Sequence, residues 1–203
     1  MDDRGLRERR AELLGALHGD VLEIGAGTGL NLDHYADDVR LVLIEPEPAM
    51  AARLTDRLAS SSREATMVEA TAEALPFPDG SFDAIVSTLV LCSVRSLPEA
   101  LGEIRRVLRP GGRLALIEHV RGSGGTAILQ EVVAPVSRLL FSCAPNRRTA
   151  EAIRAAGFDL TEVPFELSGS PLWTHPAVLG LQAAGKTVVV LEVTAIRPLD
   201  NSV

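Results

Sequence analysis

Apolar residues along this chain follow two alternating patterns. Short apolar runs bounded by polar or turn residues predict buried strands, and stretches whose apolar residues recur every three or four positions predict amphipathic helices. The predicted strands cover residues 21–24, 41–44, 66–68, 82–87 and 113–118. The predicted helices cover residues 4–17, 28–37, 48–59 and 98–108. Because strands alternate with helices, the sequence predicts an α/β fold with a parallel sheet and helices on both of its faces.

Turn residues set the predicted boundaries of the later elements. The Pro-Gly-Gly sequence at residues 110–112 is expected to end the fourth helix before the strand at 113–118. Gly157 is expected to end a helix over residues 148–156. Two further strands are predicted at residues 160–167 and 187–196.

An apolar segment at residues 126–141 is the candidate element for substrate specificity. Its apolar residues cover more than the single stripe that a surface helix needs, and Pro135 would break or kink a helix there. Two interpretations stay open: a core helix packed on the sheet, or a lid over the active site within an insertion at 121–145. A lid would imply a small lipophilic substrate, and its contact residues would be Val132, Val136 and Leu140. Trp173 could cap the same pocket, or it could pack against a neighbouring element.

Composition and charge narrow the class of protein. The 203 residues are most simply one domain, 1–203, that starts with a helix within residues 1–20 and has a sizeable core. A net charge of -7 argues against nucleic acid as the main partner, because the nucleic-acid backbone needs clustered Lys and Arg. The chain has no apolar run as long as a membrane span and no apolar signal-peptide core, and its two cysteines form no disulfide framework. A cytoplasmic protein without an integral membrane segment is therefore expected, and four scattered histidines predict no metal site.

A glycine-rich turn follows the first predicted strand. Glu23 near the end of that strand precedes the sequence Gly25-Ala26-Gly27-Thr28-Gly29. Glycine lets the backbone turn sharply and lets a ligand lie close against it. A dinucleotide-binding turn needs glycine at the first, third and sixth positions, and the sixth position here is Leu30. A nicotinamide-dependent oxidoreductase is therefore disfavoured, while binding of another ligand and a purely structural role both stay open.

Other candidate residues follow the remaining strands, because ligands of parallel sheets bind outside the carboxyl ends of the strands. Glu45 lies 22 residues beyond Glu23 and can accept hydrogen bonds from two ribose hydroxyls, although a solvated charge is the alternative. The further candidates near strand ends are Pro46, Met50, Thr71, Ala72, Glu73, Thr88, Leu89, Glu118 and His119. His119 is the candidate general base, because imidazole titrates near neutrality, or it is a strand-end histidine bonded to backbone. Glu118 is either its orienting partner or a structural acid.

Three motifs in this order give the chain a specific resemblance. The acid-x-Gly-x-Gly-x-Gly pattern of residues 23–29 resembles the first motif of class I S-adenosylmethionine (SAM)-dependent methyltransferases. Residues 72–83 and 105–112 resemble segments of the methyltransferase type 11 group, which includes enzymes related to ubiquinone and menaquinone biosynthesis. The resemblance implies a Rossmann-like, seven-stranded, mostly parallel sheet with the last strand between the fifth and sixth. It also implies SAM as cofactor, S-adenosylhomocysteine as product, ribose binding by Glu45, and an adenine border at the loop with Thr71, where the family often has Asp.

A narrower resemblance covers more of the chain. Residues 88–94, 118–120, 148–149 and 156–158 resemble the small thiol methyltransferases of the methyltransferase-like 7 type. This implies S-methylation of a small-molecule thiol, ahead of O-, N- or C-methylation in a biosynthetic pathway, with a non-catalytic SAM-binding module as a third alternative. A thiol with a pKa of roughly 8.5 is partly thiolate at neutral pH and needs little help from a base. The sequence leaves monomer and homodimer open.

Overall fold

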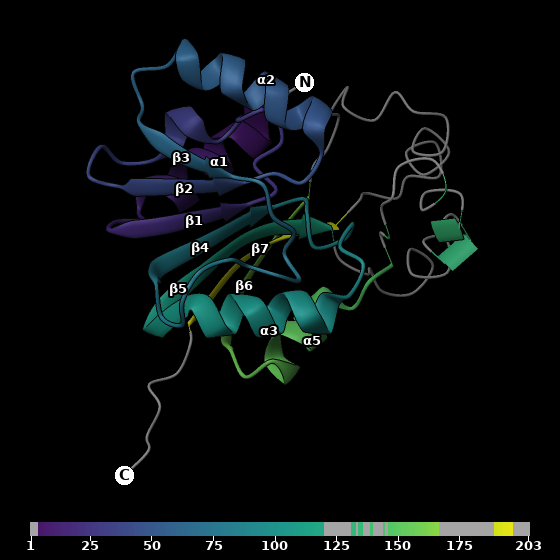
Figure 1. The fold of residues 1–203 in the computed structure, drawn as a ribbon. Helices are drawn as coiled ribbons and strands as arrows, with labels where there is room; N and C mark the ends of the chain where they lie inside the picture. Colours follow the sequence, from purple (N-terminus) through teal and green to yellow (C-terminus); the bar gives the residue numbers. More distant parts are fainter. Residues whose placement is uncertain are drawn as a thin grey trace.

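One sheet runs through the computed structural model of this chain (Figure 1). The structure describes residues 4–119, 131–132, 134–135, 139, 144, 146–166 and 189–196. Among these residues, seven strands pair in the order β3-β2-β1-β4-β5-β7-β6. Their bounds are β1 Asp20–Ile24, β2 Arg40–Ile44, β3 Ala65–Val68, β4 Phe82–Thr88, β5 Leu108–His119, β6 Asp159–Glu166 and β7 Val189–Ile196. In this order the strands from β3 to β5 are parallel, and β7 runs antiparallel to both β5 and β6. The position of β7 between β5 and β6 is the one that the family resemblance implied.

Helices cover both faces of the sheet. Figure 1 shows helices on each side of the sheet. Those on one side are α1 Arg4–Gly15 and α2 Pro48–Ala59, and those on the other are α3 Leu97–Val107 and α5 Thr149–Ala155. Because successive strand residues point to opposite faces, Val21 of β1 packs in one core with Leu14 of α1, and Leu22 packs in another core with Ile104 of α3. The predicted α/β architecture is confirmed.

The prediction of a helix from residue 28 to residue 37 is wrong. A turn and the short 3-10 helix η1 Leu32–His34 stand in its place. Gly27 and Gly29 have φ angles of 57° and 77°, which a right-handed helix excludes. The side chain of Asn31 turns inward, where Nδ2 donates to Glu23 Oε1 at 2.8 Å and to Thr88 Oγ1 at 3.1 Å. The glycine backbone and this buried amide favour the turn.

Strand β5 begins earlier than predicted. Helix α3 ends directly before it, so the Pro-Gly-Gly sequence lies inside the strand instead of preceding it. Phe82 pairs with Leu108 and Ala84 pairs with Arg113, so the residues between them form an irregularity in β5. A bulge leaves residues outside the regular ladder, where proline and glycine are tolerated. The other described elements begin and end within two residues of their predicted positions.

Several predicted features fall outside the described residues. Val136, Leu140 and Trp173 lie there, as does the side chain of His119, whose backbone ends β5. Val132 is described as helical, and 69% of its surface is exposed. Within the described part of the chain, no helix is both long and apolar enough to cross a membrane, and no three potential metal ligands come together.

Candidate active site

A cavity of about 600 Å³ opens at the carboxyl ends of β1 to β4. Its volume is in the range of small-molecule and cofactor sites. The predicted cofactor residues that line it are Gly25, Glu45, Pro46, Met50, Thr71, Ala72, Glu73 and Leu89. The other lining residues, which were not among the predicted cofactor residues, are Ile24, Ile44, Glu47, Ala70, Val90, Ser93, Val94 and Arg95. The structure thus brings together the loops after four neighbouring strands, as expected for a parallel sheet.

The other predicted cofactor residues do not line this cavity. They are Glu23, Ala26, Gly27, Thr28, Gly29 and Thr88. Glu23 is 3% exposed, and its carboxylate accepts hydrogen bonds from Asn31 Nδ2 at 2.8 Å and from the Tyr35 hydroxyl at 2.7 Å. Burial raises the pKa of Glu23 to about 7, although these two hydrogen bonds act to lower it. Asn31, which sequence analysis missed, follows the glycine turn and binds both Glu23 of β1 and Thr88 of β4. It therefore links the turn to the ends of these two strands.

The glycine turn has room for a ligand at one position and a close neighbour at another. Gly25 has a φ of 63°, and a Cβ there would lie 2.6 Å from Cγ2 of Val90. Gly27 has a φ of 57°, and a Cβ there would have no atom within 4 Å. Both positions favour glycine because their backbone is left-handed. Open space beside Gly27 is what a cofactor that lies along this turn requires.

Glu45 has the hydrogen-bonding capacity that a ribose needs. Its carboxylate is at the end of β2, and the residue is 7% exposed. Oε2 accepts from the Gly27 N–H at 2.7 Å, and Oε1 accepts from the Glu47 N–H at 2.9 Å. A carboxylate oxygen has two lone pairs, so each oxygen can accept one further hydrogen bond. Glu45 can therefore bind two ribose hydroxyls while it still holds the glycine turn.

Glu118 faces β4 and the chain that follows it. It is 1% exposed, and Oε1 accepts from Ser87 Oγ at 2.8 Å and from the backbone N–H groups of Val90 and Leu91 at 2.8 and 2.9 Å. Leu89 just before these amides has a φ of 59°, which is uncommon for a residue other than glycine and is often found at functional sites. The carboxylate of Glu118 therefore fixes the path of the chain after β4.

Glu73 holds the same stretch of chain farther along. Its Oε1 accepts from the N–H of Arg95 at 2.7 Å and from the N–H of Ser96 at 3.3 Å. Partial burial acts to raise the pKa of Glu73, but bonds from backbone amides outweigh it and keep that pKa below its ordinary value. Glu73 is therefore a charged carboxylate at neutral pH that both lines the cavity and binds one of its walls.

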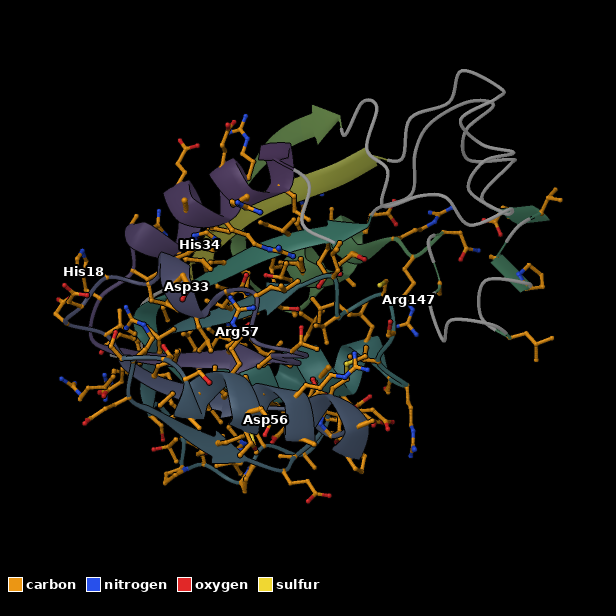
Figure 2. The ribbon with its side chains drawn as sticks, turned by 90° about the horizontal axis from the view of Figure 1, so that it is seen from above. His18, Asp33, His34, Asp56, Arg57 and Arg147 are labelled. Carbon is orange, nitrogen blue, oxygen red and sulfur yellow. The ribbon has the colours of Figure 1, made fainter. Side chains whose placement is uncertain are left out.

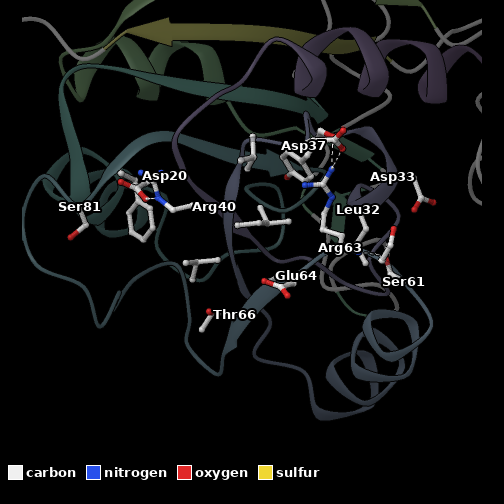
Figure 3. Close-up of a pocket in the computed structure, with 17 residues that line it drawn as sticks. Asp20, Leu32, Asp33, Asp37, Arg40, Ser61, Arg63, Glu64, Thr66 and Ser81 are labelled. Atoms are coloured by element: carbon white, nitrogen blue, oxygen red, sulfur yellow. Dashed lines mark hydrogen bonds and ion pairs between the residues drawn. The ribbon is translucent and has the colours of Figure 1, made fainter.

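A larger hollow of about 1100 Å³ lies at the opposite edge of the sheet (Figure 3). The first residues of four strands, Asp20, Arg40, Ala65 and Phe82, line it, which places it at their amino ends. Its arginines bind protein groups: Arg40 Nε lies 2.6 Å from Asp20 Oδ1, and Arg63 donates to a backbone carbonyl at 2.6 Å. Parallel sheets bind ligands at the other edge, so the 600 Å³ cavity is the candidate active site.

Comparison with known proteins identifies the family. Residues 22–116 match the family model described as a methyltransferase domain. The human thiol S-methyltransferase TMT1B is 32% identical over 200 residues, which cover 92% of this chain and 80% of that protein. The YcgJ protein of Bacillus subtilis has a TM-score of 0.71 and 21% identity over 96% of this chain and 97% of that one. Phosphoethanolamine N-methyltransferase 2 of Haemonchus contortus, in complex with SAM, has a TM-score of 0.70 and 16% identity over 96% of this chain and 53% of that one.

The comparisons confirm the predicted fold and the predicted cofactor. The sheet order and the cavity at the carboxyl ends of the strands agree with a Rossmann-like methyltransferase. The spare lone pairs of Glu45 and the open space beside Gly27 suit an adenosine-containing cofactor. The chain belongs to the SAM-dependent methyltransferases that carry this methyltransferase domain.

Proposed function

We propose that this enzyme transfers the methyl group of SAM to a small lipophilic thiol and that SAM binds in the 600 Å³ cavity. Similarity to the human thiol S-methyltransferase TMT1B along 92% of the chain is the observation that favours a thiol. The cavity walls support a lipophilic acceptor, because many of their residues are apolar. Apart from the residues proposed for the cofactor, these apolar residues are Ile24, Ile44, Ala70, Val90 and Val94.

Three groups of residues would hold the cofactor. Glu45 would accept the two ribose hydroxyls on the lone pairs that Gly27 and Glu47 leave unused. The backbone at Gly25 and Gly27 would let the cofactor lie close to the turn, and the loop that begins at Thr71 would border the adenine. The remaining residues of the proposed cofactor site, which shape the turn and the walls, are Glu23, Ala26, Thr28, Gly29, Pro46, Met50, Ala72, Glu73, Thr88 and Leu89.

The chain's own contribution to methyl transfer would be mainly positioning. SAM, when bound, would supply a methyl group on a positively charged sulfur, and S-adenosylhomocysteine would be the leaving group when the acceptor thiolate takes that methyl. The apolar walls around Val90 and Val94 would exclude water and orient the acceptor. His119 at the end of β5 would take the thiol proton, and Glu118 would act as its partner or as a structural acid. The acceptor contacts proposed from the sequence are Val132, Val136, Leu140 and Trp173.

Product analysis with a panel of acceptors tests this proposal. The enzyme is incubated with SAM and with small thiols, phenols, amines and quinone-like carbon acids, and methylated products are identified by mass spectrometry. Methylation of apolar thiols ahead of polar thiols and of the other classes is the expected result. Methylation of only phenols, amines or carbon acids would refute the thiol assignment, and SAM binding without any product would favour a SAM-binding module.

A further inference from the structure

One wall of the candidate active site is a loop without helix or strand structure. The β4 loop, residues 89–96, connects β4 to α3. The loop residues that line the cavity are Leu89, Val90, Ser93, Val94 and Arg95. Val90 also lies against the glycine turn, next to Gly25. The shape of the cavity therefore depends on what holds the main chain of this loop.

Two carboxylates bind the amide groups of the β4 loop. Glu118, from the end of β5, accepts from the N–H groups of Val90 and Leu91 at the start of the loop. Glu73, from the segment after β3, accepts from the two N–H groups directly before α3. A charged acceptor such as Glu73, whose pKa lies below its ordinary value, strengthens such hydrogen bonds to about twice the neutral case. Hydrogen bonds therefore link the start of the β4 loop to the end of β5 and the end of the loop to the segment after β3.

Arg147 binds the carbonyl groups in the middle of the same loop. It lies two residues before the start of α5, in a third segment of the chain (Figure 2). Its Nη1 donates to the Leu91 carbonyl at 2.9 Å, and its Nη2 donates to the Val94 carbonyl. Nearby, the N–H of Ala144 donates to the carbonyl of Cys92 at 2.9 Å. A guanidinium carries its donors in a rigid fork, so the half-buried side chain of Arg147 fixes the spacing of two carbonyls.

We infer that Arg147 is a positioning residue for cofactor binding, which fixes the β4 loop as a preformed wall of the cavity. The inference rests on the proposed placement of SAM in this cavity. Arg147 does not line the cavity itself, so it acts through the main chain at Leu91 and Val94. It joins the chain before α5 to the wall that the cofactor contacts.

Loss of Arg147 should appear as a loss of affinity. Without the guanidinium, the carbonyls of Leu91 and Val94 would bind water, and the middle of the β4 loop would gain backbone freedom. A ligand that needs the loop in place must then order it on binding, which lowers affinity. Ordering the backbone of one additional residue corresponds to about a tenfold increase in Kd.

Arg147→Ala and Arg148→Ala form a matched pair for the test. Arg148 is the neighbouring guanidinium, its side chain is 61% exposed, and it lies 3.3 Å from Glu151 of α5. Calorimetry with S-adenosylhomocysteine measures Kd, and hydrogen exchange measures the protection of the loop amides without ligand. Arg147→Ala should raise Kd about tenfold and speed exchange at the amides of Val90 and Leu91, whereas Arg148→Ala should leave both within about twofold of the wild type.

Each outcome decides the inference. Wild-type affinity in a folded Arg147→Ala variant would overturn it, including the case in which only the melting temperature falls. If that variant does not fold, Arg147→Lys replaces it in the test, because lysine keeps the charge but lacks the forked donors of arginine. Arg147→Lys should raise Kd about threefold, and an unchanged Kd would overturn the inference. A wild type that binds no S-adenosylhomocysteine would refute the proposed cofactor site. If the wild type and the Arg147→Ala variant bind S-adenosylhomocysteine equally tightly, the role of Arg147 is refuted and the proposed cofactor site is not.

Discussion

Replacing Glu23 by glutamine should remove a pH dependence of stability that the wild type has between pH 5.5 and pH 8.5. Burial raises the pKa of Glu23 from 4.5 to about 7. Hydrogen bonds from Tyr35 and Asn31 and the charge of Arg10 act against this rise, and the charge of Glu45 adds to it. Between pH 4.5 and pH 7, the folded protein therefore binds more protons at this carboxyl than the unfolded chain does.

The free energy of unfolding must fall as pH rises through this window. The stability from the protonated Glu23 is complete below pH 4.5, the unfolded value, and is lost as pH passes the folded value near 7. Each pKa unit corresponds to about 1.4 kcal/mol. Over the range from pH 5.5 to pH 8.5, this carboxyl should therefore reduce the free energy of unfolding by about 2 kcal/mol.

Urea unfolding followed by circular dichroism at half-unit pH steps measures this effect. The Glu23→Gln variant keeps the size of the side chain and an oxygen that accepts from Asn31, but it has no proton to lose. The difference in unfolding free energy between wild type and variant should change by about 2 kcal/mol across the range. Asp56→Asn, which alters an exposed carboxylate of α2 (Figure 2), should follow the wild type. Parallel pH profiles for wild type and Glu23→Gln would refute the reasoning.

Three further predictions concern the active site. Glu45→Gln should weaken SAM binding about tenfold in calorimetry, because the amide nitrogen cannot accept from a ribose hydroxyl; unchanged affinity would argue against ribose binding there. Gly25→Ala should lower the free energy of unfolding by about 1–3 kcal/mol and weaken SAM binding, because the new Cβ would lie 2.6 Å from Val90. Gly27→Ala should lose less stability in urea unfolding, because a Cβ there would have no atom within 4 Å. A larger loss of stability for Gly27→Ala than for Gly25→Ala would contradict the geometry. His119→Asn should lower kcat/KM for a thiol about tenfold at pH 7 and less at pH 9, where thiolate forms without a base. An unchanged pH–rate profile would exclude His119 as that base.

Local patterns in the sequence were enough to locate most strands and helices and the edge where the site lies. The strand at 21–24 and the helix at 48–59 are correct because apolar spacing reports directly which residues a strand or helix must bury. The spacing between Glu23 and Glu45 comes from the glycine turn, the short helix η1 and the strand β2, which lie between the two residues. Parallel strands then bring their carboxyl ends to one edge, so residues that follow strands meet without any knowledge of side-chain contacts.

Where contacts link distant segments, only the tertiary structure decided the outcome. The apolar pattern after residue 28 predicts a helix, but the structure has a turn there, in which Asn31 donates hydrogen bonds to Glu23 and Thr88. Glu118 was a candidate partner of His119, and the structure directs one of its oxygens to the β4 loop. Arg147 binds that loop across more than fifty residues of sequence. The periodicity of apolar residues shows which side of a strand or helix is buried, and this can be read from neighbouring positions in the sequence. A hydrogen-bond partner instead depends on strand register and on how separate segments pack, which the sequence pattern does not show.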